Sequence, residues 1–349
     1  MENEQGLDNN VLIEVTDLKT YFFLDEGIVK AVDGVDFHIN RGETLGVVGE
    51  SGCGKSITAR SVMRIVPRPG RIVEGKILLH RRSMSDNGSS ERDEILDLTA
   101  MDDQSREMRA IRGAEISMVF QEPMTSLSPV HTIANQIMEA IILHQRVPKE
   151  EARKLAIEML DLVGMPQPSR TIDRYPHELS GGMRQRAMIA MALSCHPSLL
   201  IADEPTTALD VTTEAQILKL MRGLQDELGM AIMYITHNLG VIAQVTERVM
   251  VMYMGMAVEE TDVDTLFFDP KHPYTQALLV SIPRLGHLTR DRKRLEPVRG
   301  TVPDPYNLPH GCYFHPRCDQ VIPGVCNVEP PPYIQLKPGH TVRCHLYTE

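Results

Sequence analysis

The sequence of 349 residues predicts an α/β domain with a mostly parallel sheet, followed by a small irregular extension. Three observations indicate this fold: apolar runs that alternate with helical stretches, a glycine-rich loop between a strand and a helix, and a last quarter that holds 13 of the 23 prolines and 4 of the 6 cysteines. Proline lacks the amide donor that a helix needs, so this last quarter cannot be mainly regular helix. We therefore expect two parts, an ordered domain over residues 1–265 and an appendage with its own means of holding shape over residues 266–349.

Residue types and the spacing of apolar residues predict the strands and helices of residues 1–265. β-Branched and aromatic residues predict a strand at 11–23, and 31–39 is expected to be its antiparallel partner. A third strand at 44–49 leads into the glycines and a helix that starts at Lys55. Further buried strands are predicted at 199–203 and 231–237, and further helices at 149–164 and 212–228. The polar segment 84–94 is interpreted as a solvated surface insertion.

Charge and cysteine content limit the function classes. The 36 basic and 47 acidic residues give a net charge of −11, which argues weakly against general nucleic-acid binding and against adsorption to an anionic membrane. Residues 1–265 carry −14, whereas residues 266–349 carry +3. The start of the chain is polar and acidic, and no run of about 18 apolar residues occurs. We expect a chain that stays in the cytoplasm, where thiols remain reduced.

GESGCGKS at Gly49–Ser56 matches the phosphate-binding loop pattern, and it stands between a strand and a helix as that loop requires. Glycines let backbone amides turn toward phosphate oxygens, and the helix N-terminus adds partial positive charge. Lys55 is predicted to pair with the β- and γ-phosphates, and the Ser56 hydroxyl to bind Mg²⁺. The residues expected to hold ATP here are Gly49, Glu50, Ser51, Gly52, Cys53, Gly54, Lys55, Ser56 and Ile57.

Two further segments point to nucleotide chemistry. The apolar run SLLIADEP ends in Asp203, expected to reach Mg²⁺, and Glu204, expected to polarise the water that attacks the γ-phosphate. In LSGGMRQR, Ser180, Gly181 and Gly182 stand directly before a helix, which makes an anion site. An ordinary helix cap is the alternative, but the spacing suggests a second surface for the same nucleotide.

In their order along the chain, these motifs resemble the ATP-binding subunits of ABC transporters over about residues 11–265. The resemblance implies a P-loop domain with a mixed core sheet flanked by helices, an antiparallel β subdomain and a helical subdomain. It implies that Gln121 contacts Mg²⁺ or the attacking water and that His237 hydrogen-bonds the γ-phosphate. Asp210, in the Ala-Leu-Asp element at Ala208–Asp210, would contact a partner subunit.

The resemblance also implies a shared mechanism. Phe22 would stack on adenine, with Tyr21 as the competing aromatic residue. Two subunits would face each other head to tail, so that the LSGGM segment of one covers ATP bound to the other. ATP binding would close this dimer and hydrolysis would open it. The catalytic residues implied in this way are Lys55, Gln121, Glu204 and His237.

Two segments resemble one branch of these importers, the oligopeptide and dipeptide branch. They are KHPYTQALLVSIP at Lys271–Pro283 and MVFQEPMTSLSP at Met118–Pro129. The branch also serves nickel, glutathione and some oligosaccharides, so the cargo stays open. The resemblance implies a second ATP-binding subunit, expected to be a different chain, two transmembrane permease subunits and an extracytoplasmic solute-binding protein. It places the chain peripherally at the cytoplasmic face of a bacterial or archaeal cell membrane, with no nucleic acid as partner.

Four cysteines in the last quarter follow the spacing C-x5-C-x7-C-x17-C. They are Cys312, Cys318, Cys326 and Cys344. Four thiolates in a short, reduced, proline-rich segment suit either tetrahedral zinc or an iron–sulfur cluster. The histidines nearby keep mixed Cys/His zinc open as well. Because members of this importer branch carry a 4Fe–4S cluster on such a quartet, the resemblance favours the cluster.

Two other function classes compete with import. A soluble ABC ATPase of DNA repair or translation usually carries a long coiled-coil insertion or two nucleotide domains in one chain, and neither pattern is visible in this sequence. A small-molecule kinase would use the same phosphate-binding loop, but it would give no role to LSGGM or to His237. The sequence therefore favours the energising subunit of an importer.

Overall fold

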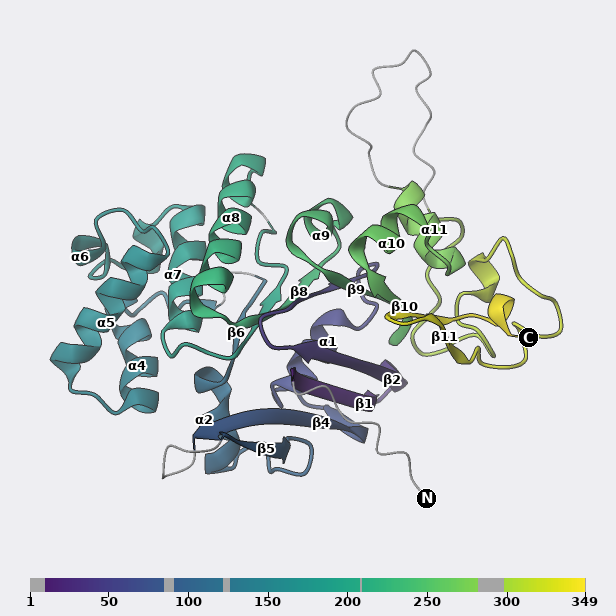
Figure 1. Ribbon diagram of the computed structural model, residues 1–349, viewed down its shortest axis with the longest axis horizontal. Coiled ribbons are helices and arrows are strands. Elements are labelled where there is room, and N and C mark those ends of the chain that lie inside the picture. Colours follow the sequence, from purple (N-terminus) through teal and green to yellow (C-terminus); the bar gives the residue numbers. More distant parts are fainter. Residues whose placement is uncertain (1–9, 85–90, 122–125, 208, 282–297, 349) are drawn as a thin grey trace, which may run out of the picture.

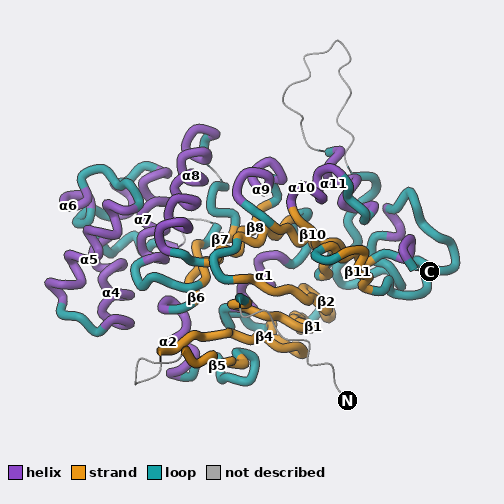
Figure 2. The backbone as a smooth tube through the Cα atoms, viewed as in Figure 1, coloured by secondary structure: helices purple, strands orange, loops and turns teal. Residues whose placement is uncertain are grey.

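The described residues form two sheets and a group of helices (Figures 1 and 2). The structure is a computed structural model that describes residues 10–84, 91–121, 126–207, 209–281 and 298–348. A four-stranded antiparallel sheet has the order β2-β1-β4-β5, and an eight-stranded mixed sheet has the order β11-β12-β10-β9-β3-β8-β7-β6. The predicted α/β fold with an antiparallel β part and a helical part is confirmed.

The strands and helices have these bounds. The antiparallel sheet contains β1 (Val11–Leu24), β2 (Gly27–Asn40), β4 (Gly70–Met84) and β5 (Glu91–Asp97). The mixed sheet contains β3 (Thr44–Val48), β6 (Ile116–Val119), β7 (Leu199–Asp203), β8 (Ala231–Thr236), β9 (Arg248–Tyr253), β10 (Met256–Asp262), β11 (Tyr333–Lys337) and β12 (His340–Arg343). The helices are α1 (Lys55–Val62), α2 (Arg106–Ala114), α4 (Ile133–Gln145), α5 (Lys149–Leu162), α6 (Pro168–Thr171), α7 (Gly181–Leu193), α8 (Val211–Leu228), α9 (Leu239–Val245), α10 (Val263–Phe268) and α11 (Pro273–Val280).

The elements predicted in the first part are present, with one correction. β1 and β2 pair antiparallel as expected, and β3, β7, β8, α5 and α8 lie within two residues of their predicted bounds. The segment 84–94, predicted as a polar, turn-rich surface insertion, contains strand residues, because Met84 ends β4 and residues 91–94 belong to β5, which pairs with β4. Residues 85–90 lie outside the described part. None of the described helices is long and apolar enough to cross a membrane.

Five neighbouring strands of the mixed sheet, β9, β3, β8, β7 and β6, run parallel. β3 pairs parallel with β8, β8 with β7, and β7 with β6. All residues of β3, β6, β7 and β8 are buried, since helices and the second sheet cover both faces. The carboxyl ends of parallel strands lie at the same edge of a sheet, so residues that follow these four strands come together there.

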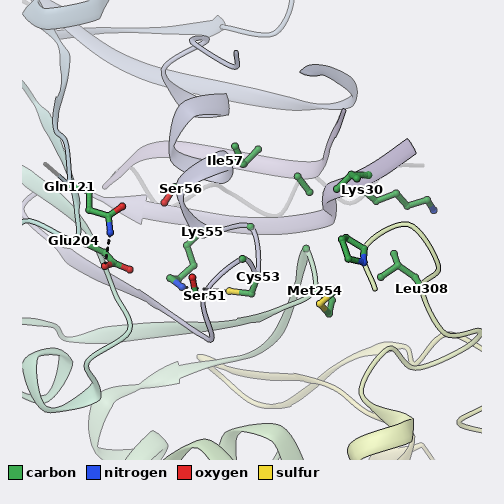
Figure 3. A pocket seen from close by; sticks show the side chains of 16 residues that line it. Lys30, Ser51, Cys53, Lys55, Ser56, Ile57, Gln121, Glu204, Met254 and Leu308 are labelled. Carbon is green, nitrogen blue, oxygen red and sulfur yellow. Dashed lines mark hydrogen bonds between the residues drawn. The ribbon is translucent and has the colours of Figure 1, made fainter. Parts of the chain in front are cut away.

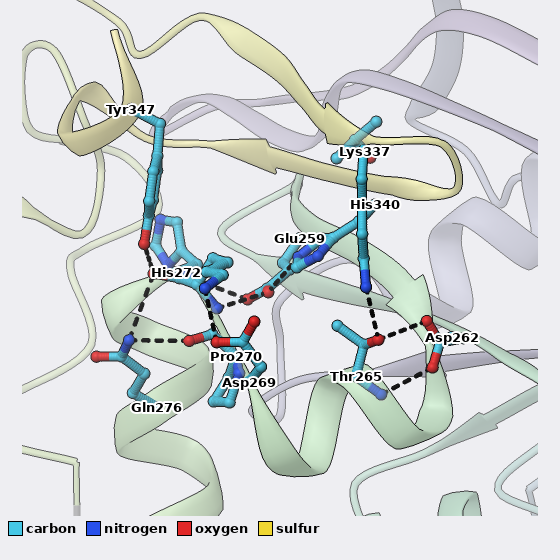
Figure 4. A network of polar contacts seen from close by, with 12 residues as sticks. Glu259, Asp262, Thr265, Asp269, Pro270, His272, Gln276, Lys337, His340 and Tyr347 are labelled. Carbon is cyan, nitrogen blue, oxygen red and sulfur yellow. Dashed lines mark hydrogen bonds and ion pairs between the residues drawn. The ribbon is translucent and has the colours of Figure 1, made fainter.

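The C-terminal region extends the same mixed sheet. β12 pairs antiparallel with β10 and with β11. The fully buried carboxylate of Glu259 on β10 accepts hydrogen bonds from the backbone N–H groups of Lys271 and His272, and His340 Nε2 on β12 lies 2.9 Å from it (Figure 4). Burial lowers the pKa of His272 to about 3, so its ring is neutral at physiological pH. One carboxylate thus joins the last strand and the segment before α11 to the core.

Glu259→Gln should destabilise the protein by about 2 to 3 kcal/mol, because the amide nitrogen would face a backbone N–H and leave a buried donor unpaired. Chemical denaturation monitored by circular dichroism measures the change. Glu329→Gln, an exposed carboxylate of the same region, is the matched control and should stay within about 0.5 kcal/mol of the wild type. Equal stability of the two variants would contradict this role of Glu259.

Candidate functional site

The phosphate-binding loop joins β3 to α1 at the edge where the parallel strands end (Figure 3). A Cβ at Gly49 would lie 2.2 Å from the carbonyl oxygen of Met252, and one at Gly54 would lie 2.2 Å from that of Ala31. Neighbouring backbone therefore leaves no room for a side chain at either position. Gly54 also has a φ of 103°, which glycine adopts without strain.

Lys55 and Ser56 begin α1. The buried Lys55 ammonium donates to the carbonyl oxygens of Gly49, at 2.8 Å, and Glu50, at 3.0 Å, so the side chain folds over its own loop. The first amides of a helix have no partner within it, and the helix dipole adds positive charge at this end. Together these groups fit the predicted site for phosphate oxygens.

The Ser56 hydroxyl donates to Asp203 Oδ1 at 2.9 Å. Burial raises the pKa of Asp203, and the nearby Glu204 carboxylate acts in the same direction. The Ser56 hydrogen bond and the charges of Arg60 and Lys55 lower this pKa, but by less than burial raises it. A hydroxyl and a carboxylate side by side are the hard oxygen ligands that Mg²⁺ prefers. The pair therefore fits the predicted magnesium site, and a bound cation would favour the ionised form of Asp203.

Glu204 is held from three elements. Gln121 Nε2, after β6, donates to its Oε2 at 3.2 Å, and the Thr207 hydroxyl donates to the same atom at 3.0 Å. His237 Nδ1, after β8, lies 3.1 Å from that oxygen. All three contacts are made to the same oxygen of Glu204, Oε2. The backbone of Glu204 is left-handed, with a φ of 47°, and its N–H donates to the carbonyl of Ile235.

A cavity lies between this group and the loop. Its lining includes loop residues 51–57 together with Gln121 and Glu204. Sequence reasoning missed the other lining residues, which are Val29, Lys30, Ala31, Met254, Gly255, Pro305 and Leu308. Pro305 and Leu308 belong to the C-terminal region. No motif marks them, because folding brings them to the loop from about 250 residues away along the chain.

Ser180, Gly181 and Gly182 lie away from this cavity. Ser180 is the N-cap of α7 and accepts a hydrogen bond from the Met183 N–H at 3.3 Å, while Gly181 lies beside Leu209. Ser180 and Gly181 are exposed, and among the described residues neither lines the cavity. The helix end predicted to bind phosphate is therefore presented to the outside and not to the loop of its own chain.

The remaining predicted nucleotide contacts are more distant. The Phe22 ring packs over Gly70 on the antiparallel sheet and is not part of the cavity lining among the described residues, so adenine stacking stays a prediction. Asp210 is the N-cap of α8 and accepts hydrogen bonds from the Thr213 amide and hydroxyl, which lower the pKa of Asp210. Ala208, of the same predicted element, lies outside the described residues.

The four C-terminal cysteines lie near one another. Burial raises the pKa of Cys312 and of Cys344 to about 11, and other thiols of the quartet act in the same direction. Backbone N–H groups donate to the sulfur atoms of Cys318 and Cys326, both at 3.4 Å. Within the described part of the chain, however, no group of three or more His, Cys, Asp or Glu residues could hold a metal ion as placed. The zinc or iron–sulfur site therefore stays a prediction.

Comparison with known proteins places this geometry in a family. Residues 32–207 match the family model described as "ABC transporter", and residues 258–326 match "Oligopeptide/dipeptide transporter, C-terminal region". The dimeric structure of MJ0796, a bacterial ABC transporter cassette, superposes with a TM-score of 0.61 at 28% identity, covering 72% of this chain and 99% of that one.

Curated relatives match along nearly the whole chain. The oligopeptide transport ATP-binding protein AppD of Bacillus subtilis is 49% identical, over 97% of this chain and 98% of AppD. The dipeptide transport ATP-binding protein DppD of the same organism is 44% identical, over 96% of this chain and 94% of DppD. The fold and the loop define an ATP-hydrolysing cassette. This chain belongs to the ABC transporter family, as an ATP-binding subunit of the oligopeptide/dipeptide branch.

Glu204→Gln should bind ATP with near-normal affinity and hydrolyse it at least about 100-fold more slowly, because the amide cannot take a proton from water. Nucleotide binding by the purified chain and phosphate release by the transporter complex that contains it measure the two effects separately. Glu214→Gln, which alters the carboxylate that accepts from Thr206 outside the cavity lining, is the control and should retain turnover. Near-normal turnover in Glu204→Gln would rule out Glu204 as the base.

Proposed function

We propose that this chain hydrolyses ATP to energise the import of peptides through a membrane transporter. The observation that carries the proposal is the meeting of Gln121, Glu204 and His237 beside the phosphate-binding loop. Near 50% identity to peptide-transport ATP-binding proteins over almost the full length supports the cargo class.

In the proposed reaction, Lys55 leaves the carbonyls of its own loop and pairs with the β- and γ-phosphates of ATP. Ser56 and Asp203 would hold Mg²⁺, which would supply positive charge to the phosphates. Glu204 accepts the proton of the attacking water, and Gln121 and His237 orient that carboxylate. The left-handed backbone at Glu204 directs its side chain toward the cavity.

The catalytic site is proposed to need a second ATP-binding subunit. The exposed end of α7, with Ser180, Gly181 and Gly182, would cover ATP on the partner, and Asp210 would contact that partner across the interface. The position of this helix end away from the cavity of its own chain supports this arrangement, and the similar cassette MJ0796 is itself a dimer. We propose that the partner is a different chain and that hydrolysis reopens the dimer.

The further partners proposed are two transmembrane permease subunits and an extracytoplasmic solute-binding protein. The chain would lie peripherally at the cytoplasmic face of a bacterial or archaeal cell membrane. Contact with permease protein agrees with the net charge of −11, which disfavours adsorption to anionic lipid.

Source cells that carry Glu204→Gln at the chromosomal locus should lose at least about 90% of their uptake of labelled oligopeptides, because transport needs the hydrolysis that this base supports. The wild-type chain should co-purify with permease subunits. Uptake of nickel, glutathione and oligosaccharides is measured in the same cells. If peptide uptake is intact and uptake of one of these other solutes is lost, that solute and not peptide is the cargo. A chain that never associates with permease subunits would contradict transport, and would leave a soluble ABC ATPase as the alternative.

We further propose that Cys312, Cys318, Cys326 and Cys344 bind a 4Fe–4S cluster. Backbone N–H groups donate to Cys318 and Cys326, and those of Phe314 and Leu346 donate to Cys312 and Cys344. Amide hydrogen bonds to sulfur are one means by which proteins tune such clusters. A tetrahedral zinc site needs four thiolates about 2.3 Å from one ion, whereas a cluster spreads them over several irons. The preference for the cluster over zinc rests on the resemblance to this importer branch and not on the placement of the sulfur atoms.

Protein purified without oxygen should contain about four iron and four sulfide per chain and absorb in the visible sulfur-to-iron band. Cys318→Ser should lose most of the iron. Cys195→Ser, which alters a half-buried thiol in the helical part, should retain it and serves as the control. A content of one zinc and no iron per chain would show that the quartet binds zinc and not the cluster. A protein without either metal would overturn both assignments.

A further inference from the structure

The C-terminal region forms hydrogen bonds and an ion pair with one residue of the phosphate-binding loop, Glu50. The Glu50 N–H donates to the Tyr274 hydroxyl of α11 at 2.9 Å. The Glu50 carboxylate accepts two hydrogen bonds from the Arg317 guanidinium, from Nη1 at 2.7 Å and from Nη2 at 3.1 Å. Such a two-point pair fixes orientation as well as charge. Residues from two places in the last quarter thus hold the backbone and the side chain of the same loop residue.

Arg317 is itself rigidly placed. Its side chain is only 3% exposed, and it also donates to the Tyr253 hydroxyl and to the carbonyls of Val298 and Arg299. Burial works against its charge, but the Glu50 carboxylate and the Tyr253 hydroxyl outweigh this and raise the pKa of Arg317. The guanidinium therefore stays charged and cannot turn away from Glu50 without losing several buried contacts.

The position of Glu50 makes this pair relevant to nucleotide binding. Its carbonyl oxygen accepts from the Lys55 ammonium, and the cavity lining begins at the next residue, Ser51. A free carboxylate in this loop would repel the phosphates of ATP, because like charges a few ångströms apart destabilise each other. The pair with Arg317 neutralises the carboxylate and ties it to the side of the loop that faces the C-terminal region.

We propose that Arg317 is a positioning residue for ATP binding, acting through Glu50. The inference rests on the proposed binding of ATP at Gly49–Ser56. It assigns to the C-terminal region a direct part in the nucleotide site, across 267 residues of chain.

Arg317→Met keeps the length of the side chain and removes its charge. It should weaken binding of a non-hydrolysable Mg-ATP analogue to the full chain by about tenfold, because Glu50 is left unpaired beside the phosphates. Glu50→Gln in the same protein should restore the affinity to within about twofold of Glu50→Gln alone. A structural effect alone would lower the melting temperature without this specific rescue.

The matched control is Arg299→Met, since Arg299 pairs with Asp319 in the same region while both side chains are exposed. It should bind the analogue like the wild type. Arg317→Lys keeps the charge but not the two-point geometry, and we expect about threefold weaker binding. This variant serves as the test if Arg317→Met does not fold. Isothermal titration calorimetry measures all affinities, with thermal unfolding recorded for each variant.

Three outcomes have distinct meanings. Weakened binding in Arg317→Met, with rescue by Glu50→Gln, supports the inference. Unchanged affinity in folded Arg317→Met, or a loss of affinity without rescue, overturns it while leaving the proposed function intact; if Arg317→Met does not fold, unchanged affinity in Arg317→Lys overturns it in the same way. Wild-type protein that binds the analogue no better than Lys55→Ala would instead overturn the proposed function, and this inference with it.

Discussion

The parallel alignment of β3, β8, β7 and β6 is the constraint on which the site depends. Each strand contributes a residue just beyond its carboxyl end: Gly49 after β3, His237 after β8, Glu204 after β7 and Gln121 after β6. In the sequence these residues are spread over 188 positions. In the sheet they lie at one edge, because parallel neighbours end on the same side. The buried apolar residues of the strands fix this register, so the core and the catalytic geometry have the same cause.

The last quarter of the chain, residues 266–349, is joined to the rest of the fold by buried contacts. Proline content predicts irregular backbone, but not where that backbone is anchored. The anchors are ordinary buried interactions: Glu259 with His340, Arg317 with Glu50, and the packing of Phe314 against Tyr253 and Tyr274. These contacts join the region to the mixed sheet and the phosphate-binding loop. The region is therefore anchored by contacts that do not involve its four cysteines.

Much of the candidate site could be predicted because its residues occur in short local patterns. The glycine-rich loop before Lys55 and Ser56 can be recognised from eight consecutive residues. The two acidic residues at the end of an apolar strand can be recognised from eight residues as well. Thr207, Pro305 and Leu308 could not be found in this way. Threonine, proline and leucine have no distinctive pattern here, and only their position in space relates them to Glu204 or the cavity.

The sequence by itself determined the class of fold and the strand, loop and helix at Thr44–Val62, and it predicted the residues that bind phosphate, because period, glycine placement and strand-to-helix spacing are local properties of the chain. The tertiary structure decided which oxygen of Glu204 is contacted, that the N-terminal end of α7 is exposed and which residue neutralises Glu50. Those features arise from contacts between segments up to 267 residues apart, and their energies depend on distance and burial in space. No short pattern encodes such contacts, so the pair of Arg317 with Glu50 became visible only in the folded chain.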